Sequence, residues 1–316
     1  MANTFLTAQV IARQALANLY ETTVAASLVH RDYEAEFNRK QGDAITIRKP
    51  AVFTAQEYNR TSGITIQEAQ ETSVNMTLNH FADVSFAVTS EDMTLRIQDF
   101  DEQLLTPAME AIAQKIDRDI LALRDDIVQE VGDATPNAAG EDYAGYNGDY
   151  PWSDSRVLIQ AGNVLDLKNV PAAQRSVIAG PTTKARWVAE KTWRQADKRG
   201  STEGLLEASM GGRVSGFDPY WTQNIGQPAG SPTTGEPTTE VNVAFHRTAF
   251  ALAFRPLELP QGALDAAIMN YKGFALRIIR DYDIDKKQMV VSIDCLYGTK
   301  TLDANRAVLI KGADAA

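Results

Sequence analysis

The feature that most constrains this chain is a stripe of apolar side chains along residues 101–131. Its members lie three or four positions apart, and they are Leu105, Met109, Ile112, Ile116, Ile120, Leu123, Ile127 and Val131. This spacing places them on one face of an α-helix. About thirty residues at ~1.5 Å each would make a rod of roughly 45 Å, so other segments must cover its apolar face.

The start of this predicted helix has two interpretations. Thr106 caps the helix with Pro107 at its first position, or a helix begun near residue 101 bends at that point. The opposite face is polar. Its acidic residues are expected to face water without the enclosure that raises a carboxylate pKa, and they are Asp117, Asp119, Asp125 and Asp126.

A second pattern, alternation of apolar and polar residues, covers residues 43–89 and predicts a long β-hairpin. One strand lies within residues 43–58, where Pro50 confines it to an edge or a bulge. The other is expected as one unbroken strand over residues 74–89, and the tip, residues 59–70, is polar. An isolated hairpin is marginal in water, and no third strand of comparable length is evident beside it. It must lie on its own subunit or on a neighbouring copy, and we favour the neighbour.

The remaining chain divides into three stretches. Residues 3–20 predict a short amphipathic helix within an N-terminal arm. Residues 132–240 predict an α/β region with a buried strand at 175–179, one helix capped by Ser153 or Asp154, and another capped by Thr182. The later strands, within residues 241–255, 274–280, 288–296 and 307–310, leave no room for crossover helices. They predict an antiparallel sheet that packs against the long helix, giving an α+β fold.

Composition excludes several classes of protein. The chain has 316 residues, 44% of them hydrophobic, and no apolar run long enough to span a membrane. Its first twenty residues lack the pattern of a signal peptide, because Arg13 interrupts the apolar stretch. The net charge of −10 disfavours direct binding of nucleic acid over the whole surface. Cys295 is the one cysteine, is expected to be buried, and fits a reducing compartment.

Each familiar pattern of catalysis or metal binding fails on inspection. His30, His80 and His246 have no second ligand at metal spacing. No phosphate-binding glycine loop and no nucleophile elbow occur. Residues 281–292 begin like a calcium loop but lack its glycine and its glutamate. The basic cluster at residues 191–199 is interpreted as the polar face of a helix rather than a phosphate site. We therefore expect no enzyme activity, no cofactor and no metal.

The order of these parts resembles the major capsid protein fold of tailed bacteriophages, the Hong Kong 97 type. An N-terminal arm leads to a long hairpin, a spine helix, a central α/β region and a returning antiparallel sheet. Several local stretches resemble the family too, at residues 212–218, 244–253, 281–283 and 296–300. The opening residues and the hairpin look most like the coat proteins of short-tailed phages, although residues 220–240 leave no room for the extra domain that those commonly carry.

The resemblance implies a domain division and a set of partners. The arm would be residues 1–40, the hairpin 41–89, the peripheral domain 90–131 with 241–316, and the axial domain 132–240. It implies a shell of pentamers and hexamers around double-stranded DNA held without sequence-specific contact, with a separate scaffolding protein and a portal protein. Such a protein is made in the host cytoplasm, resides in the virion capsid and contacts no membrane. Candidate subunit-interface residues are Phe5, Leu6, Arg48, Phe53, Tyr58, Arg60, Val74, Met76 and Leu78.

Two alternatives remain open at this point. One is an encapsulin-like compartment, which shares the fold but encloses a protein cargo. The other is a soluble α/β enzyme or a carbohydrate-binding module, which would need a pocket with converging polar groups.

Overall fold

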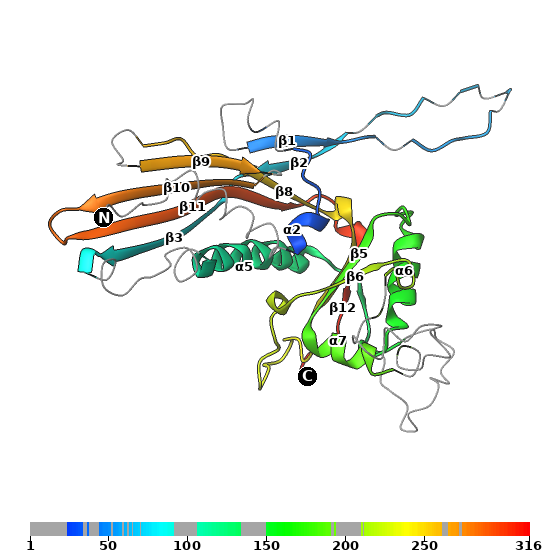
Figure 1. Cartoon of the computed structure of the whole chain (residues 1–316). Helices are drawn as coiled ribbons and strands as arrows, with labels where there is room; N and C mark the ends of the chain where they lie inside the picture. Colours follow the sequence, from blue (N-terminus) through cyan, green and yellow to red (C-terminus); the bar gives the residue numbers. More distant parts are fainter. Residues whose placement is uncertain are drawn as a thin grey trace.

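The protein, seen in a computed structural model, consists of an elongated region and a smaller region side by side, with a hairpin that projects from their junction (Figure 1). The predicted α+β class is confirmed. The described residues are 24–33, 37, 44–51, 53–58, 60–61, 63–64, 66–69, 71–91, 106–133, 150–190, 193, 210, 212–260, 265–271 and 274–316.

The elongated region is built on a five-stranded antiparallel sheet. Its strand order is β3-β11-β10-β9, and β8 pairs with the far end of β11. The bounds are β3 (His80–Thr89), β8 (Phe250–Arg255), β9 (Asp265–Tyr271), β10 (Phe274–Asp283) and β11 (Gln288–Thr301). β11 is the central strand, because it contacts β3 on one side and both β10 and β8 on the other.

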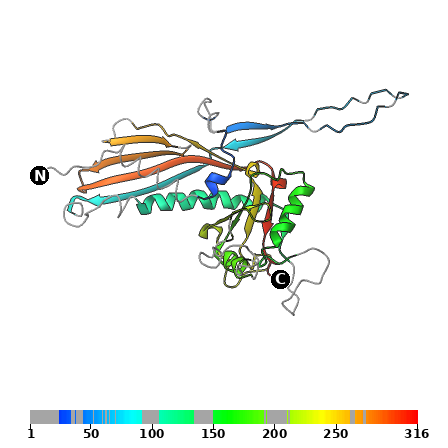
Figure 2. The ribbon, with the colours of Figure 1, turned by 45° about the vertical axis from the view of Figure 1, so that its right-hand side comes forward.

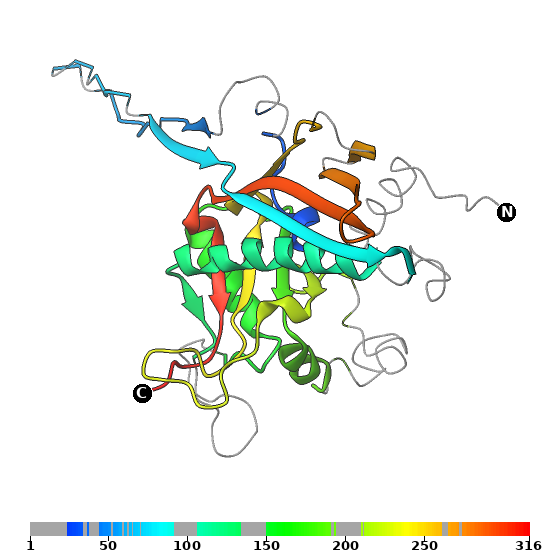
Figure 3. The same cartoon turned by 90° about the vertical axis from the view of Figure 1, so that its left-hand side faces the viewer.

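Helix α5 (Thr106–Ala122) runs along one face of this sheet (Figures 1 and 3). The predicted apolar stripe is buried there, with Met109, Ile112, Ile116 and Ile120 each at most 2% exposed. They form one core with strand residues such as Ile293. The prediction that β-structure covers this helix is therefore confirmed.

The predicted extent of this helix is wrong at its C-terminal end. A 3₁₀ turn, η2 (Leu123–Asp126), follows Ala122, and the chain then extends into β4 (Glu130–Val131). Ile127 donates its backbone N–H to Arg124, which closes the turn. Ile127 and Val131 are buried at the predicted spacing but lie on extended chain. The predicted start at residues 101–105 lies outside the described residues.

The smaller region contains a second five-stranded sheet of order β4-β12-β7-β5-β6. Its other strands are β5 (Arg175–Ala179), β6 (Asp218–Trp221), β7 (Asn242–His246) and β12 (Ala307–Ile310). The pairs β4–β12 and β5–β6 are parallel and the rest antiparallel. The prediction that all late strands share the sheet on the long helix is therefore wrong for β7 and β12. The strand predicted at residues 175–179 is confirmed.

Helices α6 (Val157–Leu167) and α7 (Pro181–Val188) pack against this second sheet. Their apolar faces meet it in a separate core, where Leu158, Leu165, Trp187 and Phe217 are fully buried. Short 3₁₀ turns lie at η3 (Gln223–Ile225), η4 (Arg247–Ala249) and η5 (Ala304–Arg306). No described helix is long and apolar enough to cross a membrane.

The predicted helix caps differ from the structure, because α6 begins at Val157 without a side-chain cap and the start of α7 is stabilised by a distant residue. Asp154 accepts the backbone N–H of Arg156 (2.9 Å), just before α6, and α6 itself has no side-chain cap. Thr182 does not cap α7. Instead the carboxylate of Glu240, far along the chain, accepts the backbone N–H groups of Thr182 (3.0 Å) and Thr183 (2.8 Å). A carboxylate at a helix N-terminus accepts hydrogen bonds from backbone N–H groups that have no partner within the helix. Its negative charge also interacts favourably with the helix dipole.

The predicted hairpin is divided between two sheets. Strands β1 (Ala44–Lys49) and β2 (Thr72–Thr77) form a two-stranded antiparallel sheet, with Ala44 opposite Thr77 and Lys49 opposite Thr72. The chain leaves β2 at Leu78 and Asn79 and continues as β3, which pairs with β11. The prediction of a single strand over residues 74–89 is therefore wrong. Its second half does have a partner strand within its own chain.

Candidate functional site

The root of the hairpin, formed by β1 and β2, is fixed to the body of its own chain. Ile45, Met76 and Leu78 are 2%, 0% and 8% exposed. They form a small core with residues from the body: Phe37, Ala251, Ala253 and Leu302. The prediction that Met76 and Leu78 contact a neighbouring subunit is corrected accordingly, because both side chains are already buried within the chain.

The outer part of the hairpin has a different character. Between Lys49 and Thr72 its described residues belong to no strand, and they extend away from the body (Figure 2). Among the described residues, Thr54 and Gln67 join its two sides by two hydrogen bonds. The backbone N–H of Thr54 donates to the side-chain oxygen of Gln67 (3.0 Å), and the Gln67 amide donates to the Thr54 carbonyl (2.5 Å). Four large apolar side chains lie open along this segment: Phe53 (62% exposed), Tyr58 (70%), Ile64 (78%) and Ile66 (85%). Clustered exposed apolar side chains of this kind mark interaction surfaces.

The other seven predicted interface residues separate into three groups. Phe53, Tyr58 and Arg60 lie exposed on the outer hairpin. On the root, Arg48 is 81% exposed and 3.9 Å from Glu71, while Val74 is half-buried. Phe5 and Leu6 lie outside the described residues.

Ile64 and Ile66 are the apolar positions on this surface that sequence reasoning missed. Their signal was available, because two isoleucines alternate within a tip that is otherwise polar. Alternation shows that they share a side of the strand-like segment. It does not show whether the chain itself covers that side.

A groove of about 500 Å³ lies where the hairpin leaves the body. It is lined by Tyr33, Ile47, Arg48, Lys49, Pro50, Ala51, Val74, Thr248, Leu302, Asp303 and Arg306. Arg306 pairs with Asp303 (3.3 Å) and donates to the Thr248 hydroxyl (2.5 Å). The groove thus offers apolar and cationic contact surface, without a paired acid and base in the arrangement that proton transfer requires.

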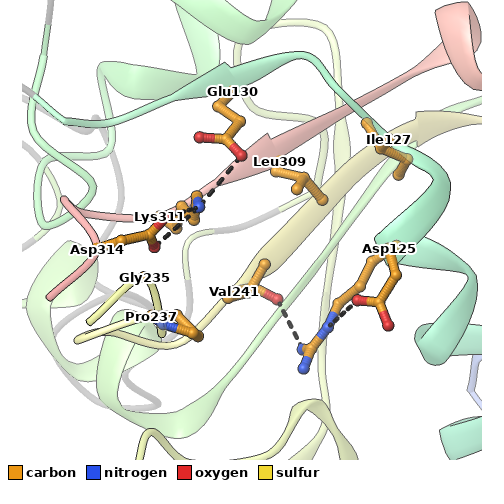
Figure 4. Close-up of a pocket in the computed structure, with 10 residues that line it drawn as sticks. Asp125, Ile127, Glu130, Gly235, Pro237, Val241, Leu309, Lys311 and Asp314 are labelled. Atoms are coloured by element: carbon orange, nitrogen blue, oxygen red, sulfur yellow. Dashed lines mark hydrogen bonds and ion pairs between the residues drawn. The ribbon is translucent and has the colours of Figure 1, made fainter. Parts of the chain in front are cut away.

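A second pocket, of about 340 Å³, lies beside β12 and the end of α5 (Figure 4). Lys311 forms ion pairs there with Glu130 (3.1 Å) and Asp314 (2.8 Å). Arg124 donates to the backbone carbonyl of Ile225 (2.8 Å). Its cations are thus engaged by groups of the chain itself. We interpret this pocket as part of the scaffold that joins the C-terminal residues to the smaller sheet.

The N-terminal segment, where described, is part of the core. Helix α2 (Ala25–Leu28) has Ala25 and Ala26 fully buried, packed with α5. His30 accepts the backbone N–H of Leu252 and donates its own to Phe250 (both 3.0 Å), so the segment lies along β8. Within the expected N-terminal arm, residues 1–40, residues 24–30 therefore pack on the body of their own chain. The predicted helix at residues 3–20 lies outside the described residues.

Asp117 anchors this segment, and its environment differs from the expected one. It was expected on the wet face of the helix, yet it is 1% exposed. It accepts the backbone N–H groups of Val24 (3.4 Å) and Ala25 (3.2 Å) and the amide of Asn224 (3.3 Å). Burial raises the pKa of Asp117 to about 6, against the lowering effect of these hydrogen bonds.

Titratable groups elsewhere in the described chain form structural contacts. No group of three or more His, Cys, Asp or Glu residues within it has the geometry of a metal site. His80 lies 3.4 Å from Asp119, and His246 contacts the Thr248 hydroxyl (2.9 Å). Cys295 is buried as predicted, and burial raises the pKa of its thiol to about 12. A thiol of this kind is a poor nucleophile at neutral pH.

Comparison with known proteins identifies the fold. No protein-family model and no curated protein matches the sequence. Among solved structures, a chain of Mycobacterium phage Che8 is similar with TM-score 0.67 and 18% identity, over 91% of this chain and 90% of that chain. The capsid of cyanophage P-SCSP1u gives TM-score 0.63 and 14% identity, over 100% and 91%. The mature capsid of bacteriophage PhiM1 gives TM-score 0.56 and 11% identity, over 87% and 84%.

The chain therefore has the fold of phage capsid proteins, the Hong Kong 97-like fold. At these low identities the similarity establishes the fold, and it extends over nearly the whole chain. The resemblance noted in the sequence is confirmed at this level.

Proposed function

We propose that this chain is a major capsid protein, many copies of which assemble into the icosahedral shell of a tailed bacteriophage. One observation carries the proposal. The hairpin leaves the body of the chain and leaves Phe53, Tyr58, Ile64 and Ile66 between 62% and 85% exposed. Burying these side chains against a second copy would stabilise the contact by roughly 25 cal/mol per Å² of apolar surface, and the fold is one that capsids use.

In this proposal each part of the chain has a role in the shell. The outer hairpin bridges to a neighbouring subunit through Phe53, Tyr58 and Arg60, with Arg48 and Val74 flanking the contact. Residues 132–240 gather around the symmetry axes of pentamers and hexamers as an axial domain. Residues 90–131 and 241–316 form the peripheral domain, and the arm, residues 1–40, adds contacts between subunits.

The partners follow from the same proposal. A separate scaffolding protein guides assembly, a portal protein occupies one vertex, and double-stranded DNA fills the shell. The net charge of −10 suits a container that encloses DNA without sequence-specific contact. The protein would be made in the host cytoplasm and reside in the virion capsid. It would act without catalysis, cofactor or metal.

The capsid proposal is supported over an encapsulin-like compartment. The similar structures include phage capsids, and another is the capsid of an empty GTA particle. Among the described residues, the two pockets give no support to the soluble-enzyme and carbohydrate-binding alternatives, because neither combines a converging polar set with an enclosed cavity.

Deletion of residues 58–70 tests the proposed role of the hairpin. The deletion removes Tyr58, Ile64 and Ile66 from the exposed surface and leaves the buried root in place. We expect a folded monomer with an unchanged circular-dichroism spectrum, and no shells in negative-stain images. Wild-type-like shells formed by the deleted chain would exclude this role.

A matched pair of substitutions separates the apolar contact from the length of the hairpin. Replacing Phe53, Tyr58, Ile64 and Ile66 by serine should also abolish shells. The control, Glu57→Gln with Glu68→Gln, alters exposed residues of the same segment and should leave shell yield unchanged. If the serine variant assembles as well as the control, apolar contact is not what holds the hairpin to its neighbour.

A further inference from the structure

The joint between β2 and β3 is the point that decides where the hairpin points. β3 stays in the plane of the large sheet, with His80 opposite Tyr297 of β11. β2 instead pairs only with β1, so the chain leaves that plane at Leu78 and Asn79. The direction of the whole hairpin therefore depends on how these two residues are seated on the body.

The seat is formed by small residues on β8 and β11. Gly298 of β11 lies opposite Ala253 of β8, and Lys300 lies opposite Ala251. Ala251 and Ala253 are both fully buried and belong to the same core as Met76 and Leu78. Small side chains at these positions let the two-stranded sheet lie close to the strands beneath it.

Gly298 is the position where the approach is closest. A Cβ at this residue would overlap the carbonyl oxygen of Thr77 and would lie 3.1 Å from Cα of Leu78. The obstructing atoms are backbone atoms, so no rotamer change can relieve the overlap. Glycine weakens a strand interior and is kept where another backbone passes close by.

A polar cluster clamps the other side of the same joint. Asp119 of α5 accepts hydrogen bonds from Tyr297 (2.5 Å) and Lys115 (2.9 Å) and lies 3.4 Å from the His80 ring nitrogen. His80 also contacts the Thr299 hydroxyl (3.3 Å) and stacks on Tyr297 with ring centroids 5.2 Å apart. The start of β3 is thus held in place. We therefore expect a disturbance at Gly298 to be taken up on the β2 side of the joint.

We propose that Gly298 is a positioning residue of the assembly surface: by letting the Thr77–Leu78 backbone lie directly on β11, it sets the direction in which the hairpin leaves the body. A Cβ there would displace this backbone on the order of 1 Å to restore ordinary contact at ~3.5 Å. The paired root is a lever of roughly 20 Å at ~3.3 Å per residue, so the displacement grows toward the tip.

A distance measurement tests this proposal in the isolated chain. Spin labels are placed on Thr72→Cys, exposed at the outer end of the root, and on Asp125→Cys, whose side chain is 86% exposed in η2, just beyond α5. The native Cys295 is buried and does not compete for the label. Double electron–electron resonance then reports the direction of the hairpin relative to the helix.

Gly298→Ala is compared with Gly230→Ala, where an added Cβ meets nothing within 4 Å. We expect Gly298→Ala to shift the mean distance and Gly230→Ala to leave it unchanged. An unshifted distance in a folded Gly298→Ala chain overturns the proposal. Should Gly298→Ala fail to fold, Ala253→Gly removes one methyl group from the seat without any clash. It should broaden the distance distribution, and an unchanged distribution would equally overturn the proposal.

The expected effect of Gly298 on assembly rests on the proposed capsid function, and it is measured in a separate experiment that images the shells. We expect Gly298→Ala to give tubes, shells of altered diameter or no shells, while Gly230→Ala gives wild-type shells. Wild-type shells from a Gly298→Ala chain with a shifted hairpin would overturn the role in assembly. If the unaltered chain never assembles, the proposed function fails, and the distance measurement still decides the role of Gly298 in the fold.

Discussion

Two buried acids, Asp117 and Glu240, show how local partners decide the behaviour of a carboxylate. Both are 1% exposed and accept backbone N–H groups. Burial by itself raises the pKa of each carboxyl group, and the hydrogen bonds lower it. For Glu240 the hydrogen bonds from Thr183, Thr182 and Gln227 outweigh burial and lower its pKa overall. For Asp117 the bonds are longer and burial prevails.

Asp117 predicts a pH dependence that a neutral variant should lack. Its pKa in the folded chain is about 6, against an ordinary 3.8, so the folded chain holds a proton that the unfolded chain has released. Stability should therefore fall as pH rises through this window, by at most about 3 kcal/mol. Urea unfolding between pH 4 and 7 should show this slope in the wild type and a flatter one in Asp117→Asn. Equal slopes would contradict the assignment.

Glu240 predicts a loss of stability at the start of α7. Glu240→Ala removes the acceptor for two backbone N–H groups, the Thr183 hydroxyl and the Gln227 amide. We expect a cost of about 2–4 kcal/mol in unfolding free energy. Because the pKa of Glu240 is lowered, its contribution is present above its ordinary pKa and is lost in acid. The matched control Glu236→Ala, in an exposed turn, should cost less than about 1 kcal/mol.

At the scale of elements, the stripe predicted the position of the long helix but not its end. Met109, Ile112, Ile116 and Ile120 are buried where the spacing placed them. Ile127 follows the same spacing of three or four residues because its side chain is also buried, although its backbone is extended rather than helical. Burial sets the apolar pattern, whereas the backbone hydrogen bond from Ile127 to Arg124 ends the helix. The pattern alone does not contain that bond.

The break in the long strand lay beyond local sequence reasoning. Residues 74–89 alternate except at His80, the one polar residue in the apolar series, and a single polar residue does not by itself indicate a change of sheet. At the break the Thr77–Leu78 backbone lies directly on Gly298 of β11, a residue distant in sequence, and local alternation cannot reveal this approach. The cap of α7 by Glu240 was missed for the same reason, because its partner lies far along the chain.

The spine helix α5 predicts a stability effect that separates buried from exposed positions. Ile116 is fully buried in the main core, whereas Val128 is 86% exposed just beyond the helix. Ile116→Ala should lower the unfolding free energy by about 2–5 kcal/mol, and Val128→Ala should change it by less than about 0.5 kcal/mol. Denaturant unfolding of both variants measures the difference. Similar losses would show that α5 is not packed as described.

At the scale of the whole molecule, the order of parts was the most predictable property. Hairpin, spine helix, α/β region and returning strands follow one another as expected, and the fold matches phage capsid proteins. The interface residues were less predictable, because exposure depends on the complete fold. Met76 and Ile66 both alternate with polar neighbours, yet one is 0% and the other 85% exposed.

The exposed apolar surface of the outer hairpin is the feature on which the proposed function rests. The described residues bury three cores, while the outer hairpin carries exposed apolar side chains away from the body. Such a surface is costly in a monomer and useful in an assembly of many copies. In the proposed assembly, the net charge of −10 would favour the solubility of subunits that have not yet joined a shell.

Light scattering over rising protein concentration, with negative-stain images of the same samples, tests the capsid proposal most directly. We predict cooperative growth of large particles, seen as shells, tubes or rings of subunits. Co-expression with a scaffolding protein from the neighbouring genes should raise the yield of closed shells. A chain that stays monomeric at every concentration, with that scaffolding protein present, would contradict the proposed function.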